Sequence, residues 1–200
     1  MPIIETGAFA LLLWAVFGYL FGSIPFGVLV SNAMGLGNLR DIGSGNTGAT
    51  NVLRTGSKPA AIATLVLDGV KGAIAALCAR AMAGEDAAQL AGLMALIGHC
   101  LPVWLKFKGG KGVATFLGLL LALSFPVGAA CCATWLVVAA LKRISSLAAL
   151  VAAGTSTFWM TLLGYPEGFL MGVALTILVF WRHKENISRL RAGTEPKIGK

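Results

Sequence analysis

The feature that most constrains this chain is a series of apolar runs that follow one another along almost its whole length. Seven runs contain few charged residues and cover 8–30, 60–83, 87–105, 112–123, 127–141, 147–163 and 168–181. Only 12% of the 200 residues are charged, and the mean hydropathy is +0.82. These values are typical of a chain embedded in a membrane. We therefore predict an all-α, polytopic helix bundle of about seven transmembrane helices, formed by a single domain over residues 1–200.

The number of spans depends on the shortest runs. A helix needs about 20 residues to cross the roughly 30 Å of hydrocarbon in a bilayer. The run 112–123 is well below this length, so five spans with a re-entrant pair are an alternative to seven.

The charged residues predict the orientation of the bundle, because they sort onto alternate connections. One set of connections holds the bases Arg40, Arg54, Lys58, Lys106, Lys108, Lys111, Lys142 and Arg143, with more bases after residue 181. The other set holds the acids Glu5, Glu85, Asp86 and Glu167, with Arg80 as the nearby base. Basic connections stay in the cytoplasm, which predicts an outer amino terminus and a cytoplasmic carboxyl terminus. A re-entrant pair would leave this orientation unchanged.

Composition also argues against several classes of protein. The net charge of +8 is spread over helix ends without one basic stripe, so we expect contact with anionic membrane lipid and no binding of nucleic acid. The four cysteines lie in or beside apolar runs without Cys-x-x-Cys spacing, which argues against a disulfide framework or a zinc site. Because no basic region precedes the first run, we expect it to remain as a span and not to be removed as a signal peptide.

The stretch from residue 43 to residue 51 is the first polar segment that suggests chemistry. It reads Gly-Ser-Gly-Asn-Thr-Gly-Ala-Thr-Asn and lies in the longest polar connection, residues 34–59. Small residues let backbone N–H groups turn toward an anion, although the same composition suits a simple turn between helices. Ahead of this segment, Ser23 and Pro25 are expected to kink the first span.

A second polar segment, residues 109–112, reads Gly-Gly-Lys-Gly and precedes the fourth run. It is not a Walker A sequence, because Gly112 stands where Ser or Thr is required, so a nucleotide-hydrolysing function is excluded. Free N–H groups at the start of a helix attract anions, and the segment is interpreted as a phosphate site with free amides.

The second apolar run carries two charged residues, Asp68 and Lys71, on one helical face. Charges inside a membrane are costly and usually mark a site or a mutual pair. The two side chains are either a pair that locks helices together, a support for residues 43–51, or part of a site. Lys71 is therefore a candidate for substrate binding.

Polar residues also follow the fifth and seventh runs. The serines at 145–146 lie where one could cap the next helix while the other contacts a ligand. His183 and Asn186 are three residues apart and so share a helical face. The tail 192–200 contains Gly, Pro and charged residues and is expected to be mobile and cytoplasmic.

Three segments together carry a resemblance to a known family: residues 43–51, residues 107–112 (Phe-Lys-Gly-Gly-Lys-Gly) and residues 182–187 (Arg-His-Lys-Glu-Asn-Ile). In order and context they resemble the bacterial acyl-phosphate:glycerol-3-phosphate acyltransferases, small integral-membrane enzymes, and the resemblance covers nearly the whole chain. It implies transfer of a fatty acyl group from acyl phosphate to the 1-hydroxyl of glycerol 3-phosphate, with lysophosphatidic acid and inorganic phosphate as products. Acyl-CoA and acyl carrier protein are not donors in this family.

The resemblance further implies a place in the cell and roles for single residues. The enzyme would lie in the bacterial cytoplasmic (inner) membrane, begin phospholipid synthesis and face the cytoplasm with its active site, while its protein partners are unknown. Combined with the polar segments above, it makes these residues candidates for catalysis: Ser44, Arg54, Lys111, His183 and Asn186. Candidates for substrate binding are Gly43, Gly45, Asn46, Thr50, Asn51, Lys71, Lys108, Gly109, Gly110, Gly112 and Ser146. Glu185 is expected to be structural.

The chemistry of the reaction fits these residue types. An acyl phosphate is already activated, so the protein must position two phosphates and stabilise an oxyanion, without a protein nucleophile. We expect neither a metal nor a cofactor. Our hypothesis is that Ser44 and Arg54 hold the acyl phosphate and that Lys111 binds phosphate. His183 and Asn186 would orient glycerol 3-phosphate, with either His183 or a substrate phosphate as the base.

Three other classes of protein fit the sequence less well. Soluble-type glycerolipid acyltransferases need His-x-x-x-x-Asp, but Trp104 and Ser188 stand five residues after the two histidines. CDP-alcohol phosphotransferases need several aspartates for metals, and the cytoplasmic half offers only Asp41 and Asp68. A small transporter or channel for an anionic substrate is the alternative, with the intramembrane charges as its site. The clustering of the polar segments on one side argues against it.

Overall fold

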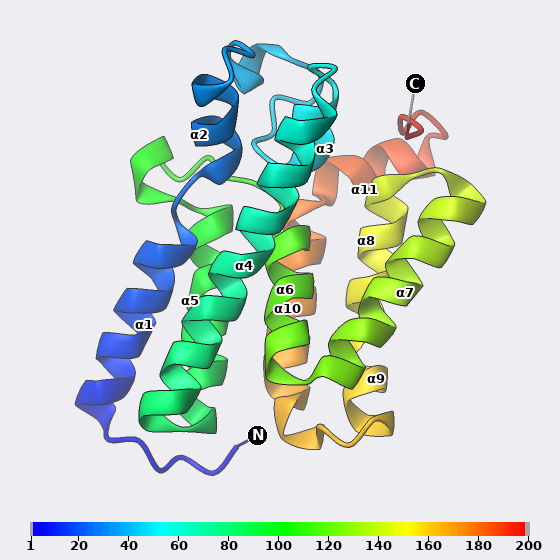
Figure 1. Ribbon diagram of the computed structural model, residues 1–200. Coiled ribbons are helices and arrows are strands. Elements are labelled where there is room, and N and C mark those ends of the chain that lie inside the picture. Colours follow the sequence, from blue (N-terminus) through cyan, green and yellow to red (C-terminus); the bar gives the residue numbers. More distant parts are fainter. Residues whose placement is uncertain (1, 199–200) are drawn as a thin grey trace.

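All seven apolar runs are helical in the computed structural model, which describes residues 2–198 and contains no strand within them (Figure 1). The α-helices are α1 (Ala8–Gly22), α2 (Phe26–Ala33), α3 (Ala49–Leu53), α4 (Lys58–Ala83), α5 (Glu85–Cys100), α6 (Val113–Leu123), α7 (Phe125–Lys142), α8 (Ser145–Gly154), α9 (Ser156–Leu162), α10 (Phe169–Arg182) and α11 (Lys184–Arg191). Short 3-10 helices cover Leu39–Asp41 (η1), Val103–Leu105 (η2) and Pro166–Gly168 (η3).

Among the described residues, four helical segments are long and apolar enough to cross a membrane, and the bent pair α8–α9 would make a fifth. The first of the four consists of α1 and α2 together. Helices α6 and α10 have only 11 and 14 residues, so the count of seven spans stays a prediction.

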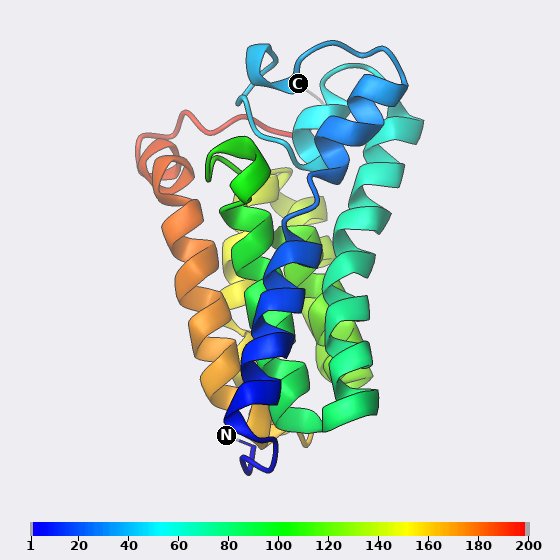
Figure 2. The same cartoon turned by 90° about the vertical axis from the view of Figure 1, so that its left-hand side faces the viewer.

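The polar connections gather at one end of the bundle. In both views α2, α3 and α11 lie at the end opposite the amino terminus, and the carboxyl terminus lies with them (Figures 1 and 2). The two termini therefore lie at opposite ends, as the charge pattern predicts. Which end faces the cytoplasm stays a prediction.

The first apolar run is broken where Ser23 and Pro25 were expected to kink it. α1 ends at Gly22 and α2 begins at Phe26, because Pro25 has no N–H to continue the helical ladder. The break exposes polar groups that other helices satisfy: Ile24 O accepts a hydrogen bond of 2.8 Å from Lys71 Nζ. Ser23 Oγ accepts one of 2.8 Å from Trp104 Nε1. The predicted kink is thus confirmed as a change of helix.

Glycines let the helices approach closely. A Cβ atom at Gly18 would lie 2.2 Å from Ala91 O, and one at Gly22 would lie 2.1 Å from Ala95 O, so α1 packs directly on the backbone of α5. Gly98 does the same from α5, where a Cβ would lie 2.2 Å from Tyr19 O. Such contacts are typical of helices that associate inside a membrane.

A continuous apolar core fills the space between α5, α6, α9 and α10. Its largest buried side chains include Leu96, Phe116, Leu119, Met160 and Leu175. The core holds these four helices together, because each of them contributes side chains to the same cluster.

We predict that Gly98→Ala destabilises the bundle. The added methyl group would lie 2.2 Å from Tyr19 O and 2.8 Å from Ser23 N. Both are backbone atoms that cannot rotate away, so overpacking by about 1–3 kcal/mol exceeds the gain in helix propensity of at most about 1 kcal/mol. Thermal unfolding in detergent measures the effect. Gly7→Ala is the matched control, because no atom lies within 4 Å of its Cβ position. Equal melting temperatures for the two variants would contradict the close contact.

Candidate active site

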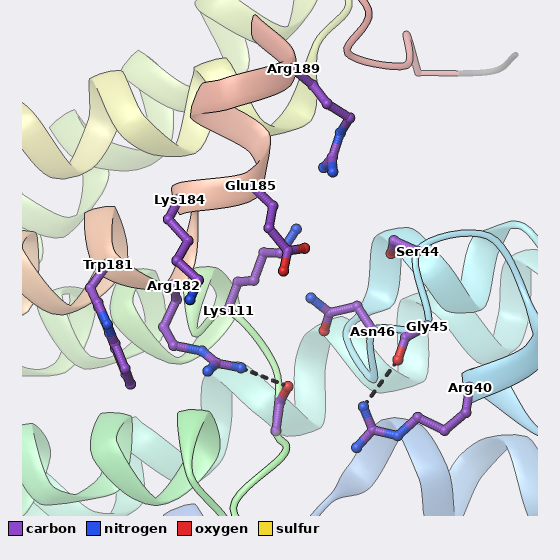
Figure 3. Close-up of a pocket in the computed structure, with 11 residues that line it drawn as sticks. Arg40, Ser44, Gly45, Asn46, Lys111, Trp181, Arg182, Lys184, Glu185 and Arg189 are labelled. Atoms are coloured by element: carbon purple, nitrogen blue, oxygen red, sulfur yellow. Dashed lines mark hydrogen bonds between the residues drawn. The ribbon is translucent and has the colours of Figure 1, made fainter.

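A cationic pocket lies at the polar end of the bundle, between residues 43–46, the segment 109–111 and the junction of α10 with α11 (Figure 3). Five of its lining side chains are cations and one is a carboxylate: Arg40, Lys111, Arg182, Lys184, Arg189 and Glu185. The other lining residues are Ser44, Gly45, Asn46, Gly109 and Trp181. Its volume of about 230 Å³ is below the ~300–1,000 Å³ of pockets for drug-sized ligands. The pocket therefore suits a small anionic molecule.

Residues 43–51 form one wall of the pocket and are organised around the side chain of Asn51. Its Oδ1 accepts hydrogen bonds from Ser44 N at 3.1 Å, from Ser44 Oγ at 3.3 Å and from Arg54 Nη1 at 3.2 Å. Its Nδ2 donates to Leu39 O at 3.0 Å. Asn51 is only 2% exposed. It therefore shapes the loop from behind, and Ser44 and Asn46 are the side chains of the loop that line the pocket (Figure 3).

The segment 109–112 forms the opposite wall and packs tightly on the end of α5. Gly109 N donates to Cys100 O at 3.2 Å, and Gly110 N donates to His99 O at 3.1 Å. A Cβ at Gly110 would lie 2.1 Å from His99 Nε2. Gly112 has φ +83°, in the left-handed region that favours glycine. The amides of Gly109 and Gly110 are thus used within the protein, which corrects the expectation that they are free for a ligand.

Two arginines hold this second wall in place through its carbonyl groups. Arg40 donates from Nη1 to Gly45 O at 3.1 Å and from Nη2 to Lys108 O, so it joins the two walls. Arg182 donates to Gly110 O at 3.1 Å and to Gly109 O at 3.2 Å. Neither arginine was selected as a site residue from the sequence. In the sequence, the only indication of a role for Arg40 and Arg182 was that each is a basic residue next to a polar motif.

A buried group of charges lies beneath the second wall. Lys71 Nζ is 2.9 Å from Asp68 Oδ1, and His99 Nδ1 is 3.5 Å from the same oxygen. Lys71 is 1% exposed and is not among the residues that line the pocket. The structure therefore confirms the mutual pair with Asp68, one of the predicted alternatives, and places Lys71 outside the pocket lining, away from its predicted role in substrate binding. The pair contacts the segment 109–112 through His99. Its link to residues 43–51, one of the predicted alternatives, is indirect and runs through Ile24 O and α2.

Lys111, Asn186 and His183 come together at the start of α11. Lys111 Nζ donates to Asn186 Oδ1. Burial, followed by the nearby charge of Arg189, lowers the pKa of Lys111 to about 8. His183 is 2% exposed, and burial lowers its pKa to about 4. Its Nδ1 lies 2.8 Å from Val179 O; a carbonyl only accepts, so Nδ1 carries the proton and Nε2 has the free lone pair.

The remaining predicted residues lie around this centre. Ser146 Oγ donates to Glu195 Oε1 at 2.6 Å, and Thr50 Oγ1 is 3.4 Å from Ser145 Oγ. Gly43 lies against Arg54, which does not itself line the pocket. Lys108 is exposed and contributes its carbonyl to Arg40.

The sequence also failed to indicate Trp181, Lys184, Glu185, Arg189 and Glu195, which line the pocket or contact its residues. The tail 192–200 had been expected to be mobile, and that expectation stays a prediction. In the described part of the tail, Glu195 contacts the site, and Ile198 N donates to Arg143 O at 2.6 Å.

Comparison with known proteins agrees with this arrangement. The family model described as glycerol-3-phosphate acyltransferase matches residues 12–193. A glycerol-3-phosphate acyltransferase of Ruegeria pomeroyi is 65% identical over 100% of this chain and 98% of its own length. One from Jannaschia sp. is 60% identical over 100% of this chain and 98% of its own length.

Two solved structures are similar in fold and sequence. Both are crystal structures of PlsY (YgiH), described as an integral membrane glycerol 3-phosphate acyltransferase. The glycerol 3-phosphate form has a TM-score of 0.89 and 40% identity, over 94% of this chain and 96% of the other. The lysophosphatidic acid form has a TM-score of 0.86 and 37% identity, over 94% and 95%.

We predict that Asp68→Asn destabilises the protein strongly. Removing the carboxylate leaves the ammonium of Lys71 buried without its counter-charge, which typically costs about 3–5 kcal/mol. The double variant Asp68→Asn/Lys71→Met removes both charges and should recover much of this loss. Thermal unfolding in detergent compares the two. If the single variant were as stable as the wild type, or if the double variant were the less stable one, Lys71 would not depend on Asp68.

Proposed function

The chain belongs to the glycerol-3-phosphate acyltransferase family, and we propose that it transfers a fatty acyl group from acyl phosphate to the 1-hydroxyl of glycerol 3-phosphate. The products would be lysophosphatidic acid and inorganic phosphate, in the first step of phospholipid synthesis. That the protein is a membrane acyltransferase follows from the family. The donor is proposed because an acyl phosphate is already activated and needs only positioning and charge stabilisation from the protein, without a protein nucleophile.

The observation that carries this proposal is the concentration of five cations around one small pocket. Acyl phosphate and glycerol 3-phosphate each bring a phosphate group, and two such groups close together repel one another unless cations lie between and around them. The cations come from η1 (Arg40), from the segment 109–112 (Lys111) and from α10 and α11 (Arg182, Lys184 and Arg189), so they reach the pocket from several sides (Figure 3).

We assign the two substrates to the two walls. Ser44 and Asn46 face the pocket from the first wall and would hold the acyl phosphate, with Arg54 assisting through the Asn51 hydrogen bonds. Lys111 would hold glycerol 3-phosphate from the other side, and Asn186, which does not line the pocket, would position the Lys111 ammonium by accepting its hydrogen bond. The apolar helices below the pocket offer a surface for the acyl chain.

In the proposed reaction the oxygen of the 1-hydroxyl attacks the acyl carbonyl carbon. A carbon–oxygen bond forms, negative charge develops on the carbonyl oxygen, and the bond between the acyl carbon and the phosphate oxygen then breaks. The cations around the pocket would stabilise both the oxyanion and the departing phosphate. The hydroxyl proton must go to a base.

Two groups could take that proton, and their pKa values favour one. With a pKa of about 4, His183 is a weaker base than a phosphate dianion, whose conjugate acid has a pKa near about 6. We infer that a substrate phosphate accepts the proton. His183 does not line the pocket, and its Nδ1 is held by Val179 O at 2.8 Å, so it would help to orient glycerol 3-phosphate from behind the lining residues.

We further propose that the protein lies in the bacterial cytoplasmic (inner) membrane with this pocket on the cytoplasmic side. Support comes from the basic connections, which gather at the pocket end of the bundle, whereas Glu85 begins α5 at the opposite end, and Glu5 and Glu167 contact Asp86 and Gln89 in the first turns of that helix. A cytoplasmic pocket would receive both water-soluble glycerol 3-phosphate and a donor dissolved in the inner leaflet.

The direct test is phosphate release by the detergent-purified protein. We expect release when acyl phosphate and glycerol 3-phosphate are both present, and no lysophosphatidic acid when acyl-CoA replaces acyl phosphate. Activity with acyl-CoA alone would overturn the assignment of the donor. A transporter would release no phosphate in detergent.

His183→Gln distinguishes the two candidate bases. If a substrate phosphate is the base, the variant should retain measurable turnover with a raised KM for glycerol 3-phosphate, whereas Lys111→Ala should lose activity. A fall in kcat by about 10²-fold or more, the lower range for general-base catalysis, with KM unchanged would instead identify His183 as the base.

The activity should fall as the pH rises above about 8. Lys111 is cationic below its pKa of about 8 and neutral above it, so its attraction for phosphate is lost on the alkaline side. The measurement is kcat/KM for glycerol 3-phosphate, which reports the free enzyme. Lys111→Arg should move this alkaline limb upward by about two pH units or more, because arginine stays protonated. An unchanged limb in that variant would exclude Lys111 as its origin.

A further inference from the structure

The carboxylate of Glu195 reaches from the tail into the group of polar side chains behind the pocket. Its Oε1 accepts hydrogen bonds from Ser146 Oγ at 2.6 Å and from Asn186 Nδ2 at 2.5 Å. Its Oε2 accepts one from Arg189 Nε at 2.7 Å. Three donors from α8 and α11 thus converge on one side chain that follows both helices in the chain.

Glu195 lies behind the pocket and not in it. Its side chain is 7% exposed, and it is absent from the residues that line the cavity, which include Lys111 and Arg189. Any effect of Glu195 on a substrate in the pocket must therefore pass through the residues it touches.

The hydrogen bond to Asn186 determines which way that amide points. A carboxylate only accepts hydrogen bonds, so it must face the NH₂ group of the amide. The amide oxygen is then turned to Lys111, whose Nζ donates to it. With the amide reversed, the two oxygens would face one another and Lys111 would face a second donor. Glu195 thereby fixes the position of the Lys111 ammonium.

We propose, on the basis of the function proposed above, that Glu195 is a positioning residue that holds Asn186, Lys111 and Arg189 in the geometry that binds the phosphate of glycerol 3-phosphate. Glu195 does not touch the substrate itself. It acts by orienting one amide and two cations, and the family model that matches this chain ends before it, at residue 193.

The charge of Glu195 adds a second effect on Lys111. Burial would raise the pKa of Glu195, but hydrogen bonds from Ser146, Asn186 and Arg189 outweigh it and keep the pKa below its ordinary value. The resulting anion raises the pKa of Lys111, as does Glu185, whereas burial, Arg189 and Arg54 lower it. Loss of the carboxylate charge therefore lowers the pKa of Lys111 further.

A rival role for Glu195 is that of a plug, in which the carboxylate occupies the place of the substrate phosphate. The two roles predict opposite results. Removing a plug would improve binding, and removing a positioning residue impairs it. The position of Glu195 outside the pocket lining favours the positioning role.

The experiment compares Glu195→Gln, Glu195→Asp and wild-type protein in detergent, with kcat and KM measured across pH 6–10. For Glu195→Gln we expect KM for glycerol 3-phosphate to rise about tenfold or more, the usual size of a lost hydrogen bond to a charged group. We also expect its alkaline limb to move to lower pH. Glu195→Asp keeps the charge and should restore the alkaline limb, with KM between the other two. Lys197→Gln is the matched control, because it changes an exposed charge of the same tail.

A further variant separates positioning from a general loss of folding. In the Lys111→Arg background, Glu195→Gln should no longer move the alkaline limb, because the titrating group is gone. An unchanged or lowered KM in Glu195→Gln, with the limb in its wild-type place, would overturn the proposal, and a lowered KM would identify a plug. If the wild-type protein itself released no phosphate, the proposed function would fail instead. The pKa of Lys111, measured by NMR in wild type and Glu195→Gln, would then test the positioning role alone.

Discussion

The contact between the segment 109–112 and the end of α5 is the interaction on which the rest of the site depends. Gly109 and Gly110 lie so close to His99 that no side chain would fit between them, and their amides are bonded to the last carbonyls of α5. His99 in turn lies against Asp68, which pairs with Lys71. A chain of close contacts thus links the segment 109–112 to the middle of the bundle, so the packing of α4 and α5 fixes the position of this wall of the pocket.

The same chain of contacts reaches the other wall. The Lys71 ammonium donates to Ile24 O at the break between α1 and α2, and α2 packs on residues 43–51, where a Cβ at Gly27 would lie 1.8 Å from Thr47 O. Burying charges in an apolar bundle is costly unless they are paired and hydrogen-bonded. Here the pairing of Asp68 with Lys71 offsets that cost. The pair lies between the segment 109–112 and residues 43–51, the two walls whose separation must stay constant if two phosphates are to meet in the pocket.

Much of the fold and part of the site could be predicted from sequence, for identifiable reasons. Apolar runs of 12 to 24 residues leave few structures other than helices in a membrane, and all seven runs are helical. Polar motifs such as Ser44 and Lys111 stand out against an apolar background. The spacing of Asp68 and Lys71 already offered their pairing as one alternative. What the sequence could not indicate were roles set by the fold: Asn51 as the centre of its loop, and Arg40 and Arg182 as clamps on carbonyl groups. Glu195 gave no local signal at all, because its three donors are brought together only by the folded bundle.

The contact of Glu195 with α8 and α11 separates insertion of the chain into the membrane from completion of its site. Every apolar run of this chain precedes Glu195, so no residue of the tail is needed for the helices to form or to enter the bilayer. The polar group around Asn186 is complete only when the tail folds back onto α8 and α11. A chain shortened before Glu195 would therefore keep all of its helices and lack the carboxylate that orients Asn186.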